Sequence, residues 1–137
     1  MGDRLSSSVR WRVYAHGLPA AVWGGVLLAL SVASNLGPIE DVDIIAHQDK
    51  VLHFLEYFVL AALAAFGLVR GTRRPREWQL RTAILAPAAY GVVLELLQIL
   101  VPERDFSTLD MLANVLGAAA GALVAMQVLE PVALRRG

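Results

Sequence analysis

The sequence predicts an all-α protein, an integral membrane four-helix bundle with both termini in the cytoplasm. The chain has 137 residues, of which 57% are hydrophobic and only 18% are charged, whereas a soluble domain carries about 25% charged residues. It contains four apolar stretches, each close to the roughly 20 residues that an α-helix needs to cross the bilayer core. The arginines gather in the segments on one side of these stretches.

The four stretches follow one another with short polar connections. They cover residues 18–36, 51–69, 80–101 and 108–129, with residues 1–17 and 130–137 as tails. The turn residues between the stretches are Gly37, Pro38, Pro75 and Pro102. We expect a single membrane domain over residues 18–129.

The first stretch also has features of a cleavable signal peptide. Basic residues precede the apolar run, and "SVAS" offers small residues near Ala33. However, the run that starts at Leu18 is long for a signal peptide, and cleavage would leave only three helices. We therefore expect an uncleaved anchor.

The charges of the connecting segments predict the orientation. Acidic residues prevail in the first and third loops, and arginines prevail in the two tails and the second loop. Basic residues mark the cytoplasmic side, so both tails and the second loop are expected inside. The arginines concerned are Arg4, Arg10, Arg12, Arg70, Arg73, Arg74, Arg76, Arg81, Arg135 and Arg136.

Polar residues of three predicted helices lie at similar depth in the outer leaflet. At about 1.5 Å rise per residue, Glu95 lies roughly 9 Å below Val101, and Asn114 roughly 10 Å below Ser107. A charge that faces lipid at mid-depth costs about 2.5–3.5 kcal/mol, so such residues normally face the bundle interior. The residues of this level are His53, Glu56, Glu95, Gln98, Asp110 and Asn114. Together they predict one shared site.

Helical spacing supports this interpretation, although simpler roles exist for most of the residues. Asp49, His53 and Tyr57 recur at every fourth position and share one face. Asp110 also follows Ser107 as S-x-x-D, the pattern of a helix capping box.

The remaining members differ in how easily a simpler role explains them. Asn114 precedes Gly117 and Gly121, a G-x-x-x-G pattern that favours close helix packing, so it could serve as an interhelical hydrogen bond. Asp49 and Lys50 could be interfacial charges in water, and Glu56 could reach the surface by snorkelling. Neither a helix cap nor a place at the membrane interface explains the carboxylate of Glu95 at its depth.

Three segments together resemble the VanZ-like family of small bacterial membrane proteins, some of which are linked to teicoplanin resistance. The segments are "DKVLHFLEYF", "YGVVLELLQILVPERDFSTLDMLANVLGAAAG" and, more loosely, "LSVASN". The resemblance covers about residues 20–125 and implies a multi-pass protein of the bacterial inner membrane. Glu56 falls at a position that the family usually leaves apolar or small. The positions that match the family pattern are Asp49, Lys50, His53, Tyr57, Glu95, Gln98, Arg104, Asp110 and Asn114.

Two classes of function agree with these residues. In the first, the cluster binds the head group of an amphiphile, either a membrane lipid, a lipid-linked envelope molecule or a lipoglycopeptide antibiotic such as teicoplanin. Lys50 and Arg104 would then hold an anionic group. Glu95, Gln98 and Asn114 would orient the polar part of the ligand.

In the second class, the protein is an integral membrane enzyme that acts on a lipid-linked substrate. His53 would perform acid/base chemistry with Glu95 or Asp110, and these three are the candidate catalytic residues. No nucleophile motif such as G-x-S-x-G is present. A proton-shuttling transporter is a third class, for which four short helices offer little room.

Composition limits the partners. Because 12 basic residues balance 12 acidic residues, no bulk charge favours nucleic acid. We expect no cofactor and no metal, because the predicted spans hold one His and the chain has no Cys. The oligomeric state stays open.

Overall fold

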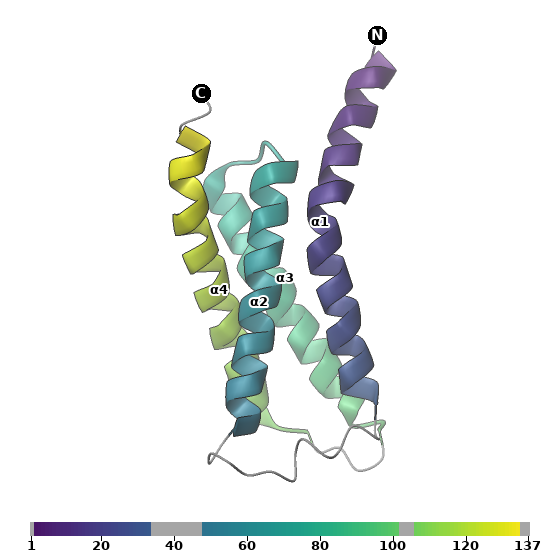
Figure 1. Ribbon diagram of the computed structural model, residues 1–137. Helices are drawn as coiled ribbons and strands as arrows, with labels where there is room; N and C mark the ends of the chain where they lie inside the picture. Colours follow the sequence, from purple (N-terminus) through teal and green to yellow (C-terminus); the bar gives the residue numbers. More distant parts are fainter. Residues whose placement is uncertain (1, 34–47, 102–105, 135–137) are drawn as a thin grey trace.

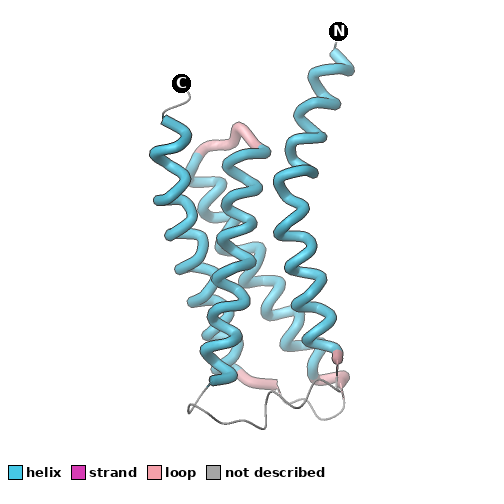
Figure 2. Tube along the Cα trace, in the orientation of Figure 1, coloured by secondary structure: helices cyan, strands magenta, loops and turns pink. Residues whose placement is uncertain are grey.

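The computed structural model is a bundle of four helices: α1 (Gly2–Val32), α2 (Gln48–Gly71), α3 (Arg76–Gln98) and α4 (Thr108–Leu134) (Figure 1). It describes residues 2–33, 48–101 and 106–134, with side chains for residues 11–33, 49–101 and 106–129. Helices make up nearly all of these residues, and the described part contains no strand (Figure 2).

All four helices are long and apolar enough to cross a membrane. The candidate spans are Trp11–Val32, Asp49–Gly71, Arg76–Gln98 and Thr108–Leu129. They correspond to the four stretches that the sequence predicts. The chain is therefore an all-helical protein with four membrane-length segments, as expected.

Only the start of α4 coincides with the predicted limits, and two of the differences at the other helix ends have a clear physical cause. Helix α1 begins at Gly2, so the helix includes most of the segment expected as a tail, because a helix that has formed adds residues at little cost. Helix α3 ends at Gln98, three residues before the predicted end at Val101. Pro102 explains this end, since its ring nitrogen has no hydrogen to donate to the carbonyl of Gln98.

The helices run alternately up and down, so both termini lie at the same end of the bundle (Figure 1). We call the opposite end the distal end; α1 and α3 end there, and α2 and α4 begin there. Helix α2 packs against all three other helices. Helix α1 is the most exposed, with 11% of its span buried against 39% for α4.

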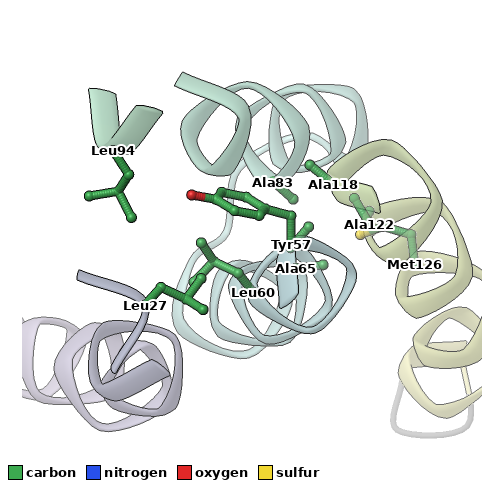
Figure 3. Packing of buried hydrophobic residues seen from close by; sticks show 10 residues of the cluster. Leu27, Tyr57, Leu60, Ala65, Ala83, Leu94, Ala118, Ala122 and Met126 are labelled. Carbon is green, nitrogen blue, oxygen red and sulfur yellow. The ribbon is translucent and has the colours of Figure 1, made fainter. Parts of the chain in front are cut away.

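Helices α2 and α4 pack closely against each other. A Cβ atom added at Gly117 would lie 2.2 Å from the Phe54 carbonyl oxygen, and one at Gly121 would lie 2.1 Å from that of Phe58. Ala118 and Ala122 are fully buried on the same helix (Figure 3). The G-x-x-x-G pattern therefore does form a close helix contact, as the sequence predicts.

Side-chain hydrogen bonds in the described part of α1 attach this helix to its neighbours. The Trp23 indole Nε1 donates to the Glu56 carbonyl at 3.0 Å, and the Tyr90 hydroxyl donates to the Gly24 carbonyl at 2.6 Å. Nearer the distal end, the Gln98 amide Nε2 donates to the Ser31 hydroxyl at 3.1 Å. In a bilayer such groups need protein partners, so these bonds fix the position of a loosely packed helix.

Candidate functional site

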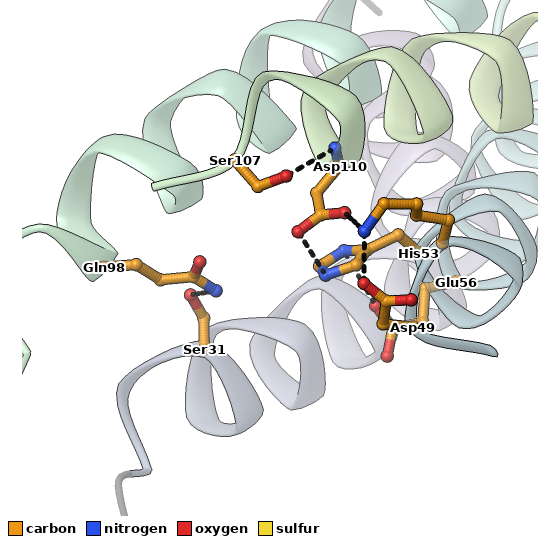
Figure 4. A network of polar contacts seen from close by, with 8 residues as sticks. Ser31, Asp49, His53, Glu56, Gln98, Ser107 and Asp110 are labelled. Atoms are coloured by element: carbon orange, nitrogen blue, oxygen red, sulfur yellow. Dashed lines mark hydrogen bonds and ion pairs between the residues drawn. The ribbon is translucent and has the colours of Figure 1, made fainter. Parts of the chain in front are cut away.

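Ionisable side chains of α2, α3 and α4 meet at the distal end. Helix α2 contributes its first turns and α4 its first turn (Figure 4), and α3 contributes Glu95 from its last turn. The meeting follows from the packing of α2 and α4, since Phe54, the contact of Gly117, directly follows His53. We call this group the distal cluster; its members are Asp49, Lys50, His53, Glu56, Glu95 and Asp110.

Lys50 connects the starts of α2 and α4. Its ammonium Nζ donates to Asp110 Oδ1 at 3.0 Å and also to the carboxylate of Asp49. The Lys50 side chain is 27% exposed and that of Asp110 is 14% exposed. Asp49 is more exposed, which fits the interfacial role considered for it. The cation of Lys50 is thus already shared by two carboxylates.

His53 lies between two carboxylates. Its Nε2 atom is 3.8 Å from Asp110 Oδ2, and its Nδ1 atom is 3.8 Å from Glu56 Oε2. Both distances exceed the 2.7–3.2 Å of a protein hydrogen bond. The Nδ1 atom is buried and has no hydrogen-bond partner. The imidazole is therefore positioned between acids without a direct hydrogen bond to either.

Glu95 supplies the most buried ionisable side chain of the cluster. It is only 2% exposed, so it faces the bundle interior, as its depth in the sequence predicts. One carboxylate oxygen of Glu95, one of Asp110 and one nitrogen of His53 all lie within 4.8 Å of one another. Three helices thus bring three candidate residues together.

Asn114 lies one helical turn inward from Asp110. It is 1% exposed, and its Oδ1 atom has no hydrogen-bond partner. A Cβ atom added at Gly91, one turn inward from Glu95, would lie 3.2 Å from Asn114 Cβ. The amide therefore lies where α3 and α4 meet, directly inward of the distal cluster.

Asp110 takes part in the cap of α4 through its backbone and in the distal cluster through its side chain. Its backbone N–H donates to the Ser107 hydroxyl at 3.2 Å, which is the cap of the S-x-x-D pattern. At the same time its carboxylate faces Lys50 and His53 (Figure 4). The cap orients the first turn of α4 and leaves both carboxylate oxygens for the cluster.

Three described residues that match the family pattern lie outside the distal cluster: Gln98, Tyr57 and Asn114, of which Asn114 lies directly inward of it. Gln98 bonds to Ser31 instead. Tyr57 is 2% exposed and belongs to the hydrophobic core, where its ring packs on Gly91. Arg104 lies outside the described residues.

The sequence left the role of Glu56 open between the shared site and the surface, and it gave no role to Ser31. Glu56 joins the cluster although its position argues against it; its spacing of three from His53 was the available signal. Ser31 partners Gln98, and its only signal was its place in "LSVASN".

The charge of the distal cluster is predominantly negative. Four carboxylates accompany one ammonium and one imidazole. Because Lys50 is already paired, the described residues offer an anion little attraction. They favour a cation, a hydrogen-bond donor, or an anion that brings a cation with it.

Comparison with known families supports the resemblance found in the sequence. The family model VanZ/LLP1 matches residues 10–130, a range that contains the whole distal cluster. Comparison with curated proteins and with solved structures finds no match. The chain therefore belongs to the VanZ/LLP1 family and is a multi-pass membrane protein.

Proposed function

We propose that the distal cluster binds the polar head group of an amphiphile at the outer face of the bacterial inner membrane. The ligand is a membrane lipid or a lipid-linked envelope molecule. Binding at that face would lower susceptibility to lipoglycopeptide antibiotics such as teicoplanin. The observation that carries the proposal is the buried Glu95 carboxylate, which lies within 4.8 Å of ligand atoms of His53 and Asp110 from two other helices.

A purely structural role explains this cluster poorly. The Ser31–Gln98 bond shows what helix attachment requires here: one donor and one acceptor, both neutral and buried. The distal cluster instead gathers several carboxylates, whose burial is costly unless a partner offsets their charge. An arrangement with this cost is typical of a functional site in a membrane protein.

The arginine distribution supports the outer location. Arginines flank the end of the bundle that holds both termini and the connection between α2 and α3. If basic segments face the cytoplasm, the distal end faces out. There a head group can reach the cluster while its hydrocarbon chains stay in the outer leaflet.

Mass spectrometry of the protein extracted in mild detergent tests the proposal. We expect a lipid or lipid-linked molecule to co-purify with the parent protein and to be lost from Glu95→Gln and Asp110→Asn. Glu77→Gln is the matched control, because Glu77 is an exposed carboxylate at the other end of the same helix. Equal lipid content in Glu95→Gln and in the parent would contradict the proposal.

The alternative function, acid/base catalysis on a lipid-linked substrate, draws support from one observation. His53 lies between Asp110 and Glu56, with 3.8 Å to each, so a carboxylate could orient the imidazole for proton transfer. The same mass spectrometry separates the two functions. A chemically altered lipid pool in cells that overproduce the parent, but not His53→Gln, would favour the enzyme.

A further inference from the structure

We propose that His53, Glu95 and Asp110 bind a divalent metal ion of the zinc class, and that this ion holds the anionic part of the head group. The second half rests on the proposed function, whereas metal binding stands on the geometry of the cluster alone. The sequence argues against a metal because its predicted spans hold only one His and the chain has no Cys. It does not show that two carboxylates from other helices lie beside that His.

The ligand atoms have the separations that a small cation needs. One atom of each residue lies within 4.8 Å of the other two, and His53 Nε2 faces Asp110 Oδ2 at 3.8 Å. Around tetrahedral zinc, with bonds of about 2.0–2.2 Å, neighbouring ligand atoms are about 3.4 Å apart. Side-chain movements of about 1 Å or less would close the sphere, because the donor atoms end flexible side chains.

The partners of these ligands resemble the outer shell of a metal site. Lys50 occupies Asp110 Oδ1, which leaves Oδ2 directed toward His53. On the other side of the imidazole, Glu56 faces Nδ1. Metal-bound histidines usually direct their second ring nitrogen at a carboxylate or carbonyl, and bound carboxylates are themselves hydrogen-bonded. A metal on Nε2 would place the proton on Nδ1, which is buried and has no hydrogen-bond partner.

The charge and the burial of the distal cluster also favour a bound metal ion. The distal cluster holds four carboxylates and one ammonium, so a dication reduces the repulsion among the carboxylates. Buried charges in proteins are paired or coordinate metals. The Asn114 Oδ1 atom, buried and without a hydrogen-bond partner, adds an oxygen on the inward side that is available to a cation or its water.

The donor set favours zinc over the hard cations. Imidazole suits zinc, whereas calcium takes six to eight oxygen ligands and magnesium usually keeps several waters. Three protein ligands leave one position open in a four-coordinate site. An anionic oxygen of a head group, from a phosphate or a carboxylate, can fill that position. This gives the negatively charged cluster a way to bind an anionic amphiphile.

Direct metal binding to the full-length protein in detergent tests the inference. The protein is stripped with a chelator, dialysed against Zn²⁺ and analysed for bound metal by mass spectrometry and calorimetry. We expect one zinc ion per parent chain. Loss of an outer-shell partner typically weakens metal binding by about 10–100-fold, so Glu56→Gln should show this loss. In Glu95→Gln and Asp110→Asn the affinity for zinc should fall by at least about 100-fold. The control Glu77→Gln should bind zinc as tightly as the parent does.

The result for the parent protein tests the metal-binding inference even if a variant fails to fold. A parent that binds no zinc, or a folded Glu95→Gln that binds zinc as tightly as the parent, would overturn the inference. Treating the parent with chelator while following the co-purified lipid separates the two proposals. Release of the lipid supports the bridging ion. Retention of the lipid overturns the bridging role of the ion and leaves the proposed function intact. Zinc binding by a protein that carries no lipid supports the metal site and contradicts the proposed function.

Discussion

At the scale of single residues, the polar groups of the distal end divide into two kinds. The Ser31–Gln98 pair satisfies itself and attaches α1 to α3. His53 and Asp110 face each other at 3.8 Å, and the buried Glu95 carboxylate lies beside them. The first kind has a sufficient structural explanation, and for the second we propose a ligand.

This division predicts that Gln98 is structural although it matches the family pattern. We expect Gln98→Ala to lower stability by about 0.6 kcal/mol, and at most about 1.7, because these are the energies of interhelical hydrogen bonds in membranes. Lipid binding should be retained. Unfolding in detergent of Gln98→Ala, Ser31→Ala and the double variant gives the coupling energy. A stable Gln98→Ala protein that has lost its lipid would show that Gln98 contacts the ligand.

The sequence predicts which residues face inward better than it predicts their partners. The depth of Glu95 in an apolar stretch already requires a protein environment, and the structure buries it. Its neighbours depend on the rotation and spacing of three helices, which no local pattern encodes. For this reason Gln98 was grouped with Glu95, and the approach of Glu56 to His53 was missed.

At the scale of helices, the contact of α4 with α2 positions the cluster. The G-x-x-x-G pattern predicts a close contact but does not name the neighbour. The structure identifies the Phe54 and Phe58 carbonyls of α2 as that neighbour. Because Asp110 precedes this contact on α4 and Lys50 precedes it on α2, the glycines hold the two side chains in register.

Substitution of Gly121 therefore affects both stability and site. In Gly121→Leu, even the first side-chain carbon would lie 2.1 Å from the Phe58 carbonyl oxygen, which is backbone and cannot rotate away. Overpacking of this kind costs about 1–3 kcal/mol or more, and we expect a lower melting temperature in detergent. Gly25→Leu is the control, because no atom lies within 4 Å of a Cβ added there. Equal melting temperatures for the two variants would refute the close contact.

At the scale of the whole molecule, the helices alternate in direction, so the two ends of the bundle lie on opposite sides of the four membrane-length segments (Figure 1). The distribution of arginines then predicts that the distal end faces out. The number and approximate limits of the spans were predictable from hydropathy, since the bilayer fixes the length of an apolar helix. The α-helical structure of residues before Leu18 was not predictable in this way, because it lies beyond the apolar stretch.

Cysteine labelling in intact cells checks the orientation. The chain has no cysteine of its own, so Asp43→Cys and Arg74→Cys each report on a single site. Asp43 lies outside the described residues, in the first loop, and Arg74 lies in the exposed connection between α2 and α3. We expect an impermeant thiol reagent to label Asp43→Cys and to spare Arg74→Cys. The reverse result would place the distal cluster at the cytoplasmic surface.

The central claim is that the distal cluster is a ligand site, and Glu95→Gln tests it most directly. The amide keeps the shape of the side chain and removes a charge that is costly to bury, so we expect folding stability to change by no more than about 1 kcal/mol. The measurement is survival of cells on teicoplanin, with expression and melting temperature determined in parallel and Glu77→Gln as the control. The account predicts that Glu95→Gln loses protection while remaining folded and that Glu77→Gln retains it. A folded Glu95→Gln protein that protects as well as the parent would contradict the account and leave the cluster a structural role.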